Sequence, residues 1–232
     1  MEMHPVSRDK TGAETAMPKI AGQEGVENSY KLKTPADNIA YYRDFAPTYD
    51  TDFAGVMGWQ YPKMIAEAYM RFAAEADVPI ADIGCGTGWV ATELQAARVA
   101  IDGLDISPEM LEVAREKQLY RSLYQVDLTG TLEAVANGYG AVLSAGTFTH
   151  GHLGPVPLRG LLKIACPGAL FVIGVNQAHF DKQGFAGVLA TMEQTGEIGP
   201  VRIDEVKMYS KTGHDHSNDR AVILQYRKAE GK

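Results

Sequence analysis

The chain has 232 residues, of which 45% are hydrophobic and 22% charged, and its net charge is -7. This composition is typical of a globular protein with one sizeable core, and the negative charge disfavours binding to a phosphate backbone. No apolar run is long enough to span a bilayer, the first residues lack the apolar part of a secretory signal, and the two cysteines form no disulfide framework. We therefore expect a cytoplasmic protein without membrane or nucleic-acid partners.

The chain begins with a segment of low hydrophobicity. Residues 1–29 contain no aromatic side chain and are rich in Gly, Glu, Lys and Thr, so we expect them to be flexible. Aromatic residues are then frequent from Tyr30 onward, and the apolar residues between 61 and 76 recur with a helical period. We predict a single domain over residues 30–232, with a helical entry segment over residues 30–76.

After residue 78, short apolar runs alternate with helical patterns. We predict strands at 79–83, 99–104, 123–126, 141–145 and 169–175, and helices at 89–97, 108–117, 157–165 and 185–195. Two further strand-like runs, 201–210 and 220–227, are joined by a polar turn. This order predicts an α/β fold with a mostly parallel sheet, helices on both faces and a C-terminal antiparallel hairpin.

Metal ligands are scarce. His214 and His216 form a short His-Asp-His motif, but it lies in the polar stretch between the last two predicted strands. We interpret it as a solvated hairpin loop and predict no metal site.

A glycine-rich loop, residues 84–88, follows the first predicted strand and precedes a helix. Glycine allows a sharp turn and a close approach to a ligand, and this end of a parallel sheet is the usual ligand crevice. A Walker loop is excluded because no Lys-Ser or Lys-Thr pair follows. The spacing of Gly86, Gly88 and Ala91 fits a dinucleotide fingerprint, so NAD stays open at this point.

Carboxylates stand at the ends of three successive predicted strands. Asp82 lies at the end of the first strand, where an anion suits a cationic ligand better than a pyrophosphate. Asp105 is placed to accept hydrogen bonds from ribose hydroxyls. Asp127 can accept from an adenine amine while Leu128 packs on the ring. Together the three carboxylates favour a cationic adenosyl ligand.

These motifs resemble those of a known family. Residues 81–88 look like the first motif of the class I S-adenosylmethionine (SAM)-dependent methyltransferases, residues 103–111 like the second, and Asp127 like their adenine-binding position. Residues 164–170 are similar to the turn before the fifth strand, although they depart from its usual sequence. The resemblance covers residues 39–228 and implies SAM as cofactor and a Rossmann-like, seven-stranded sheet.

A narrower resemblance is carried by the aromatic entry segment. Residues 42–50 and 58–62 resemble the Williams–Beuren-region methyltransferase-like proteins and their bacterial relatives, in which this segment lies over the cofactor. The resemblance implies a cofactor site made of Tyr42, Arg43, Tyr49, Asp82, Gly84, Cys85, Gly86, Asp105, Ile106, Met110, Asp127, Leu128 and Ala145.

The expected function is methyl transfer from SAM to a small-molecule acceptor. His150 and His152, in the loop after the fourth predicted strand, are candidates for a general base near neutral pH. Asn176 and His179 are candidates for the acceptor side, although capping of the next helix explains them equally well. Two alternatives stay open, an NAD-linked oxidoreductase and a SAM-binding protein without catalysis.

Overall fold

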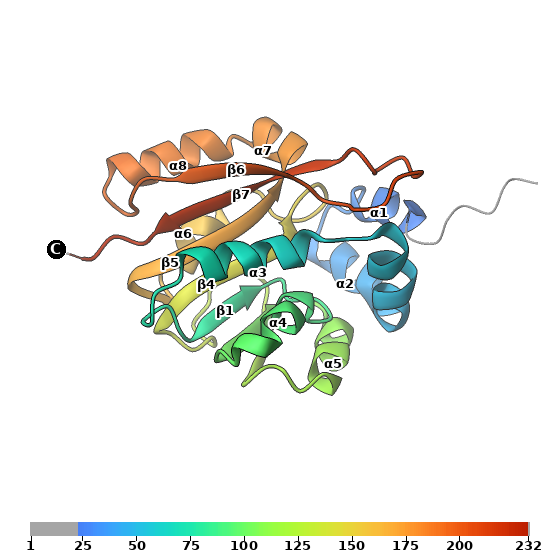
Figure 1. Ribbon diagram of the computed structural model, residues 1–232, viewed down its shortest axis with the longest axis horizontal. Coiled ribbons are helices and arrows are strands. Elements are labelled where there is room, and N and C mark those ends of the chain that lie inside the picture. Colours follow the sequence, from blue (N-terminus) through green and yellow to red (C-terminus); the bar gives the residue numbers. More distant parts are fainter. Residues whose placement is uncertain (1–22, 232) are drawn as a thin grey trace, which may run out of the picture.

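The computed structural model describes residues 23–231, so residues 1–22 of the expected flexible segment lie outside the described residues. One seven-stranded sheet has the order β3-β2-β1-β4-β5-β7-β6. Figure 1 labels β1, β4, β5, β6 and β7 of this sheet. Its strands are β1 (Ile80–Ile83), β2 (Ile101–Asp105), β3 (Leu123–Gln125), β4 (Tyr139–Phe148), β5 (Ala165–Asn176), β6 (Arg202–Lys207) and β7 (Arg220–Arg227). Strands β1 to β5 are parallel, and β7 pairs antiparallel with both β5 and β6. The predicted fold class is confirmed.

Helices cover both faces of the sheet. The α-helices are α1 (Gln23–Ser29), α2 (Pro35–Phe45), α3 (Tyr61–Phe72), α4 (Trp89–Leu94), α5 (Pro108–Glu116), α6 (Pro157–Leu161), α7 (Gln177–Gln183) and α8 (Phe185–Gln194). Shorter helical turns are η1 (Ala46–Thr48), η2 (Tyr49–Gly55) and η3 (Gln95–Ala97). One hydrophobic cluster packs α3 and α4 on one face, and a second packs α6 and α8 on the other.

The observed elements differ from the predicted ones mainly in length. β4 and β5 extend beyond their apolar runs, because they pair with each other at Tyr139 and Ala165 and again at Phe148, and β7 pairs with β5 as far as Asn176. The helix predicted at 157–165 ends at Leu161 and is followed by a turn into β5. Part of the segment expected to be flexible, residues 23–29, forms α1, because Val26 is buried and the carbonyl of Gly25 accepts from the Tyr41 hydroxyl at 2.7 Å.

The entry segment is helical from a well-defined start. The side chain of Thr34 accepts from the backbone N–H of Asp37 at 3.1 Å, and the Asp37 carboxylate accepts from the N–H of Thr34 at 2.9 Å. This reciprocal capping, with Pro35 in the first turn, fixes where α2 begins.

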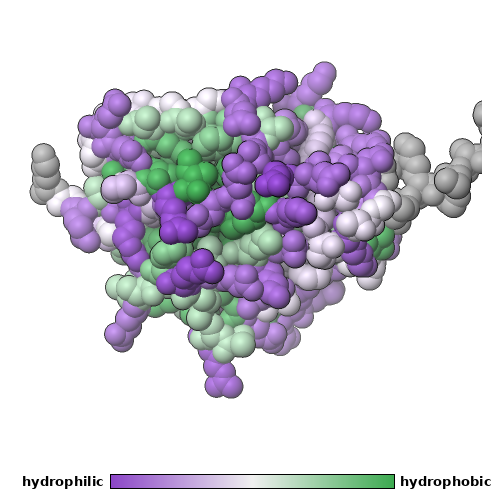
Figure 2. Space-filling model, turned by 45° about the horizontal axis from the view of Figure 1, so that its top comes forward, coloured by the Kyte–Doolittle hydropathy of each residue, from purple (hydrophilic) through white to green (hydrophobic). Residues whose placement is uncertain are grey.

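The C-terminal hairpin forms one edge of the sheet. Charged residues on β6, among them Arg202, Asp204 and Lys207, protect this edge against pairing with another chain. On the face shown in Figure 2, hydrophilic side chains divide the hydrophobic surface into separate areas. None of the described helices is long and apolar enough to cross a membrane.

The loop between β6 and β7 is less exposed than its composition suggested. His214 is only 9% exposed and its ring meets that of Tyr209 edge-on at 5.2 Å. His216 pairs instead with Asp219, at 2.9 Å. The interpretation as a solvated loop is therefore wrong for His214, because the hairpin folds back onto the aromatic residues beneath it. Within residues 23–231, no three His, Cys, Asp or Glu side chains are grouped so as to hold a metal.

Gly174 provides a test of the packing between β5 and α3. A Cβ at this position would lie 2.5 Å from the hydroxyl oxygen of Tyr61, which is fully buried and donates to the carbonyl of Val222 at 2.9 Å. We expect Gly174→Ala to lower the free energy of unfolding in urea by about 1–3 kcal/mol. Gly187→Ala, on the exposed side of α8 with open space around it, should leave stability unchanged or raise it by up to about 1 kcal/mol. Equal stability of both variants would contradict this packing.

Candidate functional site

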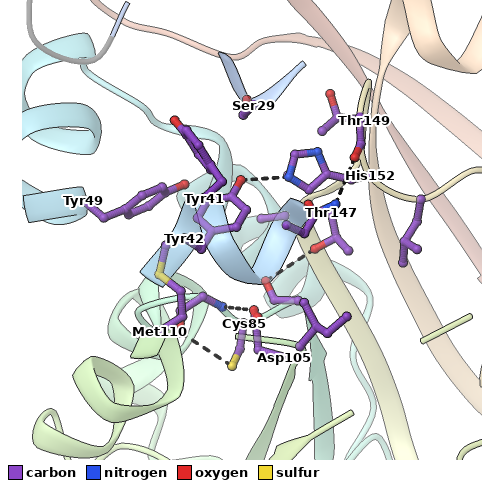
Figure 3. Close-up of a pocket in the computed structure, with 18 of the residues that line it drawn as sticks. Ser29, Tyr41, Tyr42, Tyr49, Cys85, Asp105, Met110, Thr147, Thr149 and His152 are labelled. Carbon is purple, nitrogen blue, oxygen red and sulfur yellow. Dashed lines mark hydrogen bonds between the residues drawn. The ribbon is translucent and has the colours of Figure 1, made fainter. Parts of the chain in front are cut away.

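A cavity of about 260 Å³ lies at the carboxyl ends of the parallel strands. It opens where β1 separates β2 from β4, the point at which the strand order reverses and where open α/β sheets bind ligands. We refer to residues 35–55, which comprise α2, η1 and η2, as the lid. Aromatic side chains of the lid project into the cavity, and Tyr42 and Tyr49 are among them (Figure 3).

The glycine loop between β1 and α4 is shaped by close packing. Gly84 has φ +63°, and a Cβ there would overlap the side chain of Thr147 on β4. The N–H of Cys85 donates to the carbonyl of Leu104 at 3.0 Å, and that of Gly86 donates to the Asp105 carboxylate at 2.8 Å. The N–H of Gly88 donates to the carbonyl of Cys85 at 2.9 Å. These amides are therefore not free to bind a phosphate, as a pyrophosphate loop requires.

Two buried carboxylates form the wall beside this loop. Asp105 accepts from the N–H of Ser107 at 2.9 Å as well as from Gly86, and burial raises its pKa. Asp82 is 1% exposed and accepts from the hydroxyl of Tyr120 at 2.7 Å through Oδ2, whereas its Oδ1 has no hydrogen-bond partner. Burial, reinforced by the charge of Asp105, raises the pKa of Asp82 to about 7. The wall is suited to a cation, which would compensate the unpaired oxygen.

The third carboxylate lies beyond β3. Asp127 accepts through Oδ1 from the N–H and the hydroxyl of Thr129, at 2.8 and 2.7 Å, in a turn that fixes the position of the carboxylate. It lines the cavity together with Leu128, Ile106 and Met110. An acceptor for an amine thus stands next to apolar side chains that can pack on a ring, the combination that an adenine base requires.

On the opposite side, a histidine faces the lid. The Tyr42 hydroxyl and His152 Nε2 are 2.8 Å apart, and His152 Nδ1 is 2.9 Å from the carbonyl oxygen of His150 (Figure 3). Because a carbonyl only accepts, Nδ1 carries the hydrogen and Nε2 accepts from Tyr42. Burial lowers the pKa of His152, so the ring is a neutral acceptor at neutral pH.

Most of the predicted site residues are brought together, and two are not. Arg43 does not line the cavity, because its exposed side chain pairs with Asp44 at 2.9 Å. His150 does not line it either, and its ring packs edge-on against those of Tyr30 and His179, with centroids 5.3 and 5.0 Å away. The predicted cofactor residues that do line the cavity are Tyr42, Tyr49, Asp82, Gly84, Cys85, Gly86, Asp105, Ile106, Met110, Asp127, Leu128 and Ala145.

Of the two residues predicted on the acceptor side, one lines the cavity and the other does not. Asn176 lines the cavity and caps α7 at the same time, since its Oδ1 accepts from the N–H of His179 at 3.1 Å. His179 itself lies behind the cavity wall, with Nε2 3.0 Å from the carbonyl oxygen of Leu153.

Sequence reasoning missed the role of Asp50, in the helical turn η2. Its carboxylate accepts from Thr87 Oγ1 at 2.5 Å and Trp89 Nε1 at 2.7 Å, and pairs with Lys117 Nζ at 2.6 Å. Asp50 thereby joins the lid to the glycine loop, α4 and the end of α5. On the other side of the lid, Asn38 Nδ2 donates to the carbonyl of Gly151 at 3.2 Å. Asp50 stands in the aromatic segment singled out above, but no sequence pattern links it to residues 87, 89 and 117.

Comparisons with known proteins agree with this geometry. A family model described as a methyltransferase domain matches residues 80–165. Human methyltransferase-like protein 27 is 27% identical over 190 residues, covering 79% of this chain and 75% of that protein. The ubiquinone/menaquinone biosynthesis C-methyltransferase of Campylobacter jejuni is 34% identical over 91 residues, covering 34% of this chain and 38% of the relative.

Solved structures match over most of the chain at lower identity. The cyclase SpnF has a TM-score of 0.62 at 17% identity and covers 86% of this chain and 98% of its own. A putative SAM-dependent methyltransferase from Methanococcus maripaludis has a TM-score of 0.54 at 18% identity, covering 83% and 94%. At these identities the likeness establishes the fold.

The bonds of Asp50 predict how firmly the lid is held. Asp50→Asn removes the charge from three contacts, each of which is stronger with a carboxylate, so we expect opening of the lid to become easier by about 1–3 kcal/mol. Hydrogen exchange of the backbone amides in residues 35–55 should speed up accordingly. Asp52→Asn is the matched control, because Asp52 lies in the same helical turn and accepts from the adjacent Thr51. Equal exchange in the two variants would show that Asp50 does not hold the lid.

Proposed function

Because the chain belongs to the class I SAM-dependent methyltransferases, we propose that it transfers a methyl group from SAM to a small molecule bound beneath the lid. The observation that supports a small acceptor is the covered cavity of about 260 Å³, whose lid is bonded to the glycine loop through Asp50 and to the loop after β4 through Asn38. A nucleic acid would require an open, basic groove, whereas Lys33 is the one Lys or Arg among the described residues that line this cavity. A protein chain would require a groove open enough to admit a polypeptide segment, which a lid bonded on two sides disfavours.

The residues present fit SAM. Asp82 Oδ1, buried and without a partner, suits a cationic group, and SAM carries both an ammonium and a sulfonium. Asp105, held by two backbone N–H groups, can accept from ribose hydroxyls, and Asp127 can accept from the adenine amine. When bound, SAM supplies an electrophilic methyl group. The lid residues Tyr42 and Tyr49 cover the cavity and exclude water from it.

We assign the proton-accepting role to His152. Its Nε2 accepts from the Tyr42 hydroxyl, whose oxygen is in turn free to accept a proton from an acceptor group in the cavity. A proton that enters at Tyr42 thus has a route to a neutral imidazole, and the carbonyl of His150 holds that ring in the required tautomer. The two histidine candidates are therefore not equivalent, because His150 stands outside the cavity wall.

The two alternatives are less well supported. An NAD-linked oxidoreductase needs loop amides free for a pyrophosphate, but those of Cys85, Gly86 and Gly88 are already bonded. Two buried carboxylates beside the loop also repel such an anion. A protein that binds SAM without transferring its methyl group can have the same fold, because one fold hosts several functions. Only a measurement of methyl transfer distinguishes it from an enzyme. The similarity to the cyclase SpnF illustrates this point.

Methyl-labelled SAM tests the proposed function. After incubation of the purified protein with separated small-molecule, RNA and protein fractions of a cell extract, we expect label in the small-molecule fraction. Label confined to RNA or protein would contradict the proposal. Calorimetric titration should show binding of SAM and S-adenosylhomocysteine. Binding of NADH without a response to SAM would contradict the cofactor.

The raised pKa of Asp82 predicts a pH dependence. Below about pH 7 the carboxyl becomes protonated and no longer attracts a cation, so the affinity for SAM should fall as the pH drops from about 8 to 6, by up to about tenfold per unit. Asp82→Asn should bind SAM more weakly at pH 8, with little change in affinity over this range. Tyr120→Phe keeps the carboxylate but removes the hydrogen bond that lowers its pKa, so its midpoint should move to higher pH. Identical profiles for the three proteins would refute this role of Asp82.

A further inference from the structure

The cavity extends beyond the residues assigned to the cofactor. Its second part lies at the carboxyl ends of β4 and β5, under α1 and beside the turn that follows β6. We call this part the acceptor compartment and define it by the lining residues Tyr30, Trp59, Thr149, Asn176, Met208 and Tyr209.

No charged side chain belongs to the acceptor compartment. The carboxylates that line the cavity, Asp82, Asp105 and Asp127, all stand at the ends of β1, β2 and β3, and Lys33 lies exposed just before α2. One charge acts on the compartment from outside its lining: Asp219, which bonds to His216, interacts electrostatically with Tyr30 and Tyr209. A carboxylate in the compartment would lose its hydration and be repelled by Asp219, and an ammonium group would exchange its hydration for the attraction of a carboxylate that already has a partner. An uncharged molecule bears no such cost.

The walls of the compartment are aromatic. Trp59 packs directly over Gly146, where a Cβ would lie 3.1 Å from the indole ring, and it is joined to Tyr209 by an isolated antiparallel bridge. Tyr30 also lines the compartment, and its ring packs edge-on against that of His150. Rings in this arrangement offer flat faces and edges on which another planar group can pack.

Polar groups are concentrated at one place in this wall. Thr149 is only 6% exposed, and its buried Oγ1 interacts with the Tyr30 hydroxyl but makes no hydrogen bond of normal geometry. A buried hydroxyl without a well-formed hydrogen bond is unfavourable, so a ligand with a hydrogen-bonding group gains by providing one. Tyr42 and His152 line the same cavity (Figure 3). His152 belongs to the same loop as Thr149, and Tyr42 bonds to His152 from the lid.

We infer, on the basis of the proposed function, that the methyl acceptor is an uncharged planar molecule with a hydroxyl group, which packs among Tyr30, Trp59 and Tyr209. Its hydroxyl lies between Thr149 and the Tyr42–His152 pair. In the transfer, the O–H bond of the acceptor breaks and an O–C bond to the methyl group forms, while the electron pair of the broken C–S bond stays on sulfur. The acceptor proton passes to Tyr42 as Tyr42 gives its own to His152 Nε2, so charge is conserved and Tyr42 is regenerated.

Four probes with one ring system test the charge preference: naphthol, naphthoate, naphthylmethylammonium and naphthalene. Each is titrated calorimetrically into the full chain saturated with S-adenosylhomocysteine. We expect naphthol to bind at least about tenfold more tightly than either ion, a difference of about 1.4 kcal/mol. Equal or tighter binding of naphthoate or of the ammonium probe would overturn the inference. Failure to bind S-adenosylhomocysteine at all would instead contradict the proposed function.

The hydroxyl contact is tested separately. Thr149→Val keeps the shape of the side chain and removes its oxygen. It should therefore lower the affinity for naphthol about fivefold and leave the affinity for naphthalene unchanged. Tyr42→Phe, which keeps the ring, should have the same selective effect. Thr191→Val is the matched control, because Thr191 lies on the exposed side of α8, away from the cavity, and its hydroxyl donates to the carbonyl of Gly187. Equal losses for both probes, in either Thr149→Val or Tyr42→Phe, would overturn the assignment of the hydroxyl.

Discussion

The burial of two carboxylates in one wall is the constraint on which the rest of the site depends. Asp82 and Asp105 stand at the ends of adjacent strands, and both have raised pKa values because they are removed from water. Asp105 is stabilised by two N–H groups, whereas one oxygen of Asp82 has no partner. The fold therefore holds negative charge without a counter-charge at the carboxyl ends of β1 and β2, and a cationic ligand would neutralise it. The same hydrogen bond that stabilises Asp105 takes the Gly86 N–H away from any phosphate.

The lid completes this environment. Together with Trp59, its aromatic side chains from Tyr41 onward form a continuous series of ring contacts, with neighbouring centroids 5.0–6.4 Å apart. Asp50 anchors this series to the glycine loop, and Asn38 anchors it to the loop after β4. A low dielectric around the buried carboxylates requires such a cover, since water would otherwise screen them.

The parts of the site formed by local sequence were predictable, and the parts formed by distant contacts were not. The glycine loop and the three strand-end aspartates were identified because strand, turn and carboxylate follow one another along the chain. Arg43 was expected at the cofactor, but helix α2 directs its side chain to solvent. A resemblance in sequence does not determine which side of a helix faces the cavity. Asp50 was missed because its partners lie 37 to 67 positions away. The distinction between His150 and His152 depends on the tight turn after β4, which the alternation of strands and helices does not specify.

Tyr42 belongs to the lid, lines the cavity beside the residues proposed to hold the cofactor and bonds to His152, on the side proposed for the acceptor. On the proposed function, this one lid forms part of the wall for both ligands, so whichever ligand binds first and restricts the lid further bears the entropic cost of doing so. The second then binds to a lid that is already in place. By thermodynamic linkage the effect is reciprocal, so that cofactor and acceptor increase each other's affinity by the same factor. On the proposed function, a single tyrosine thereby couples the two binding equilibria within one polypeptide chain.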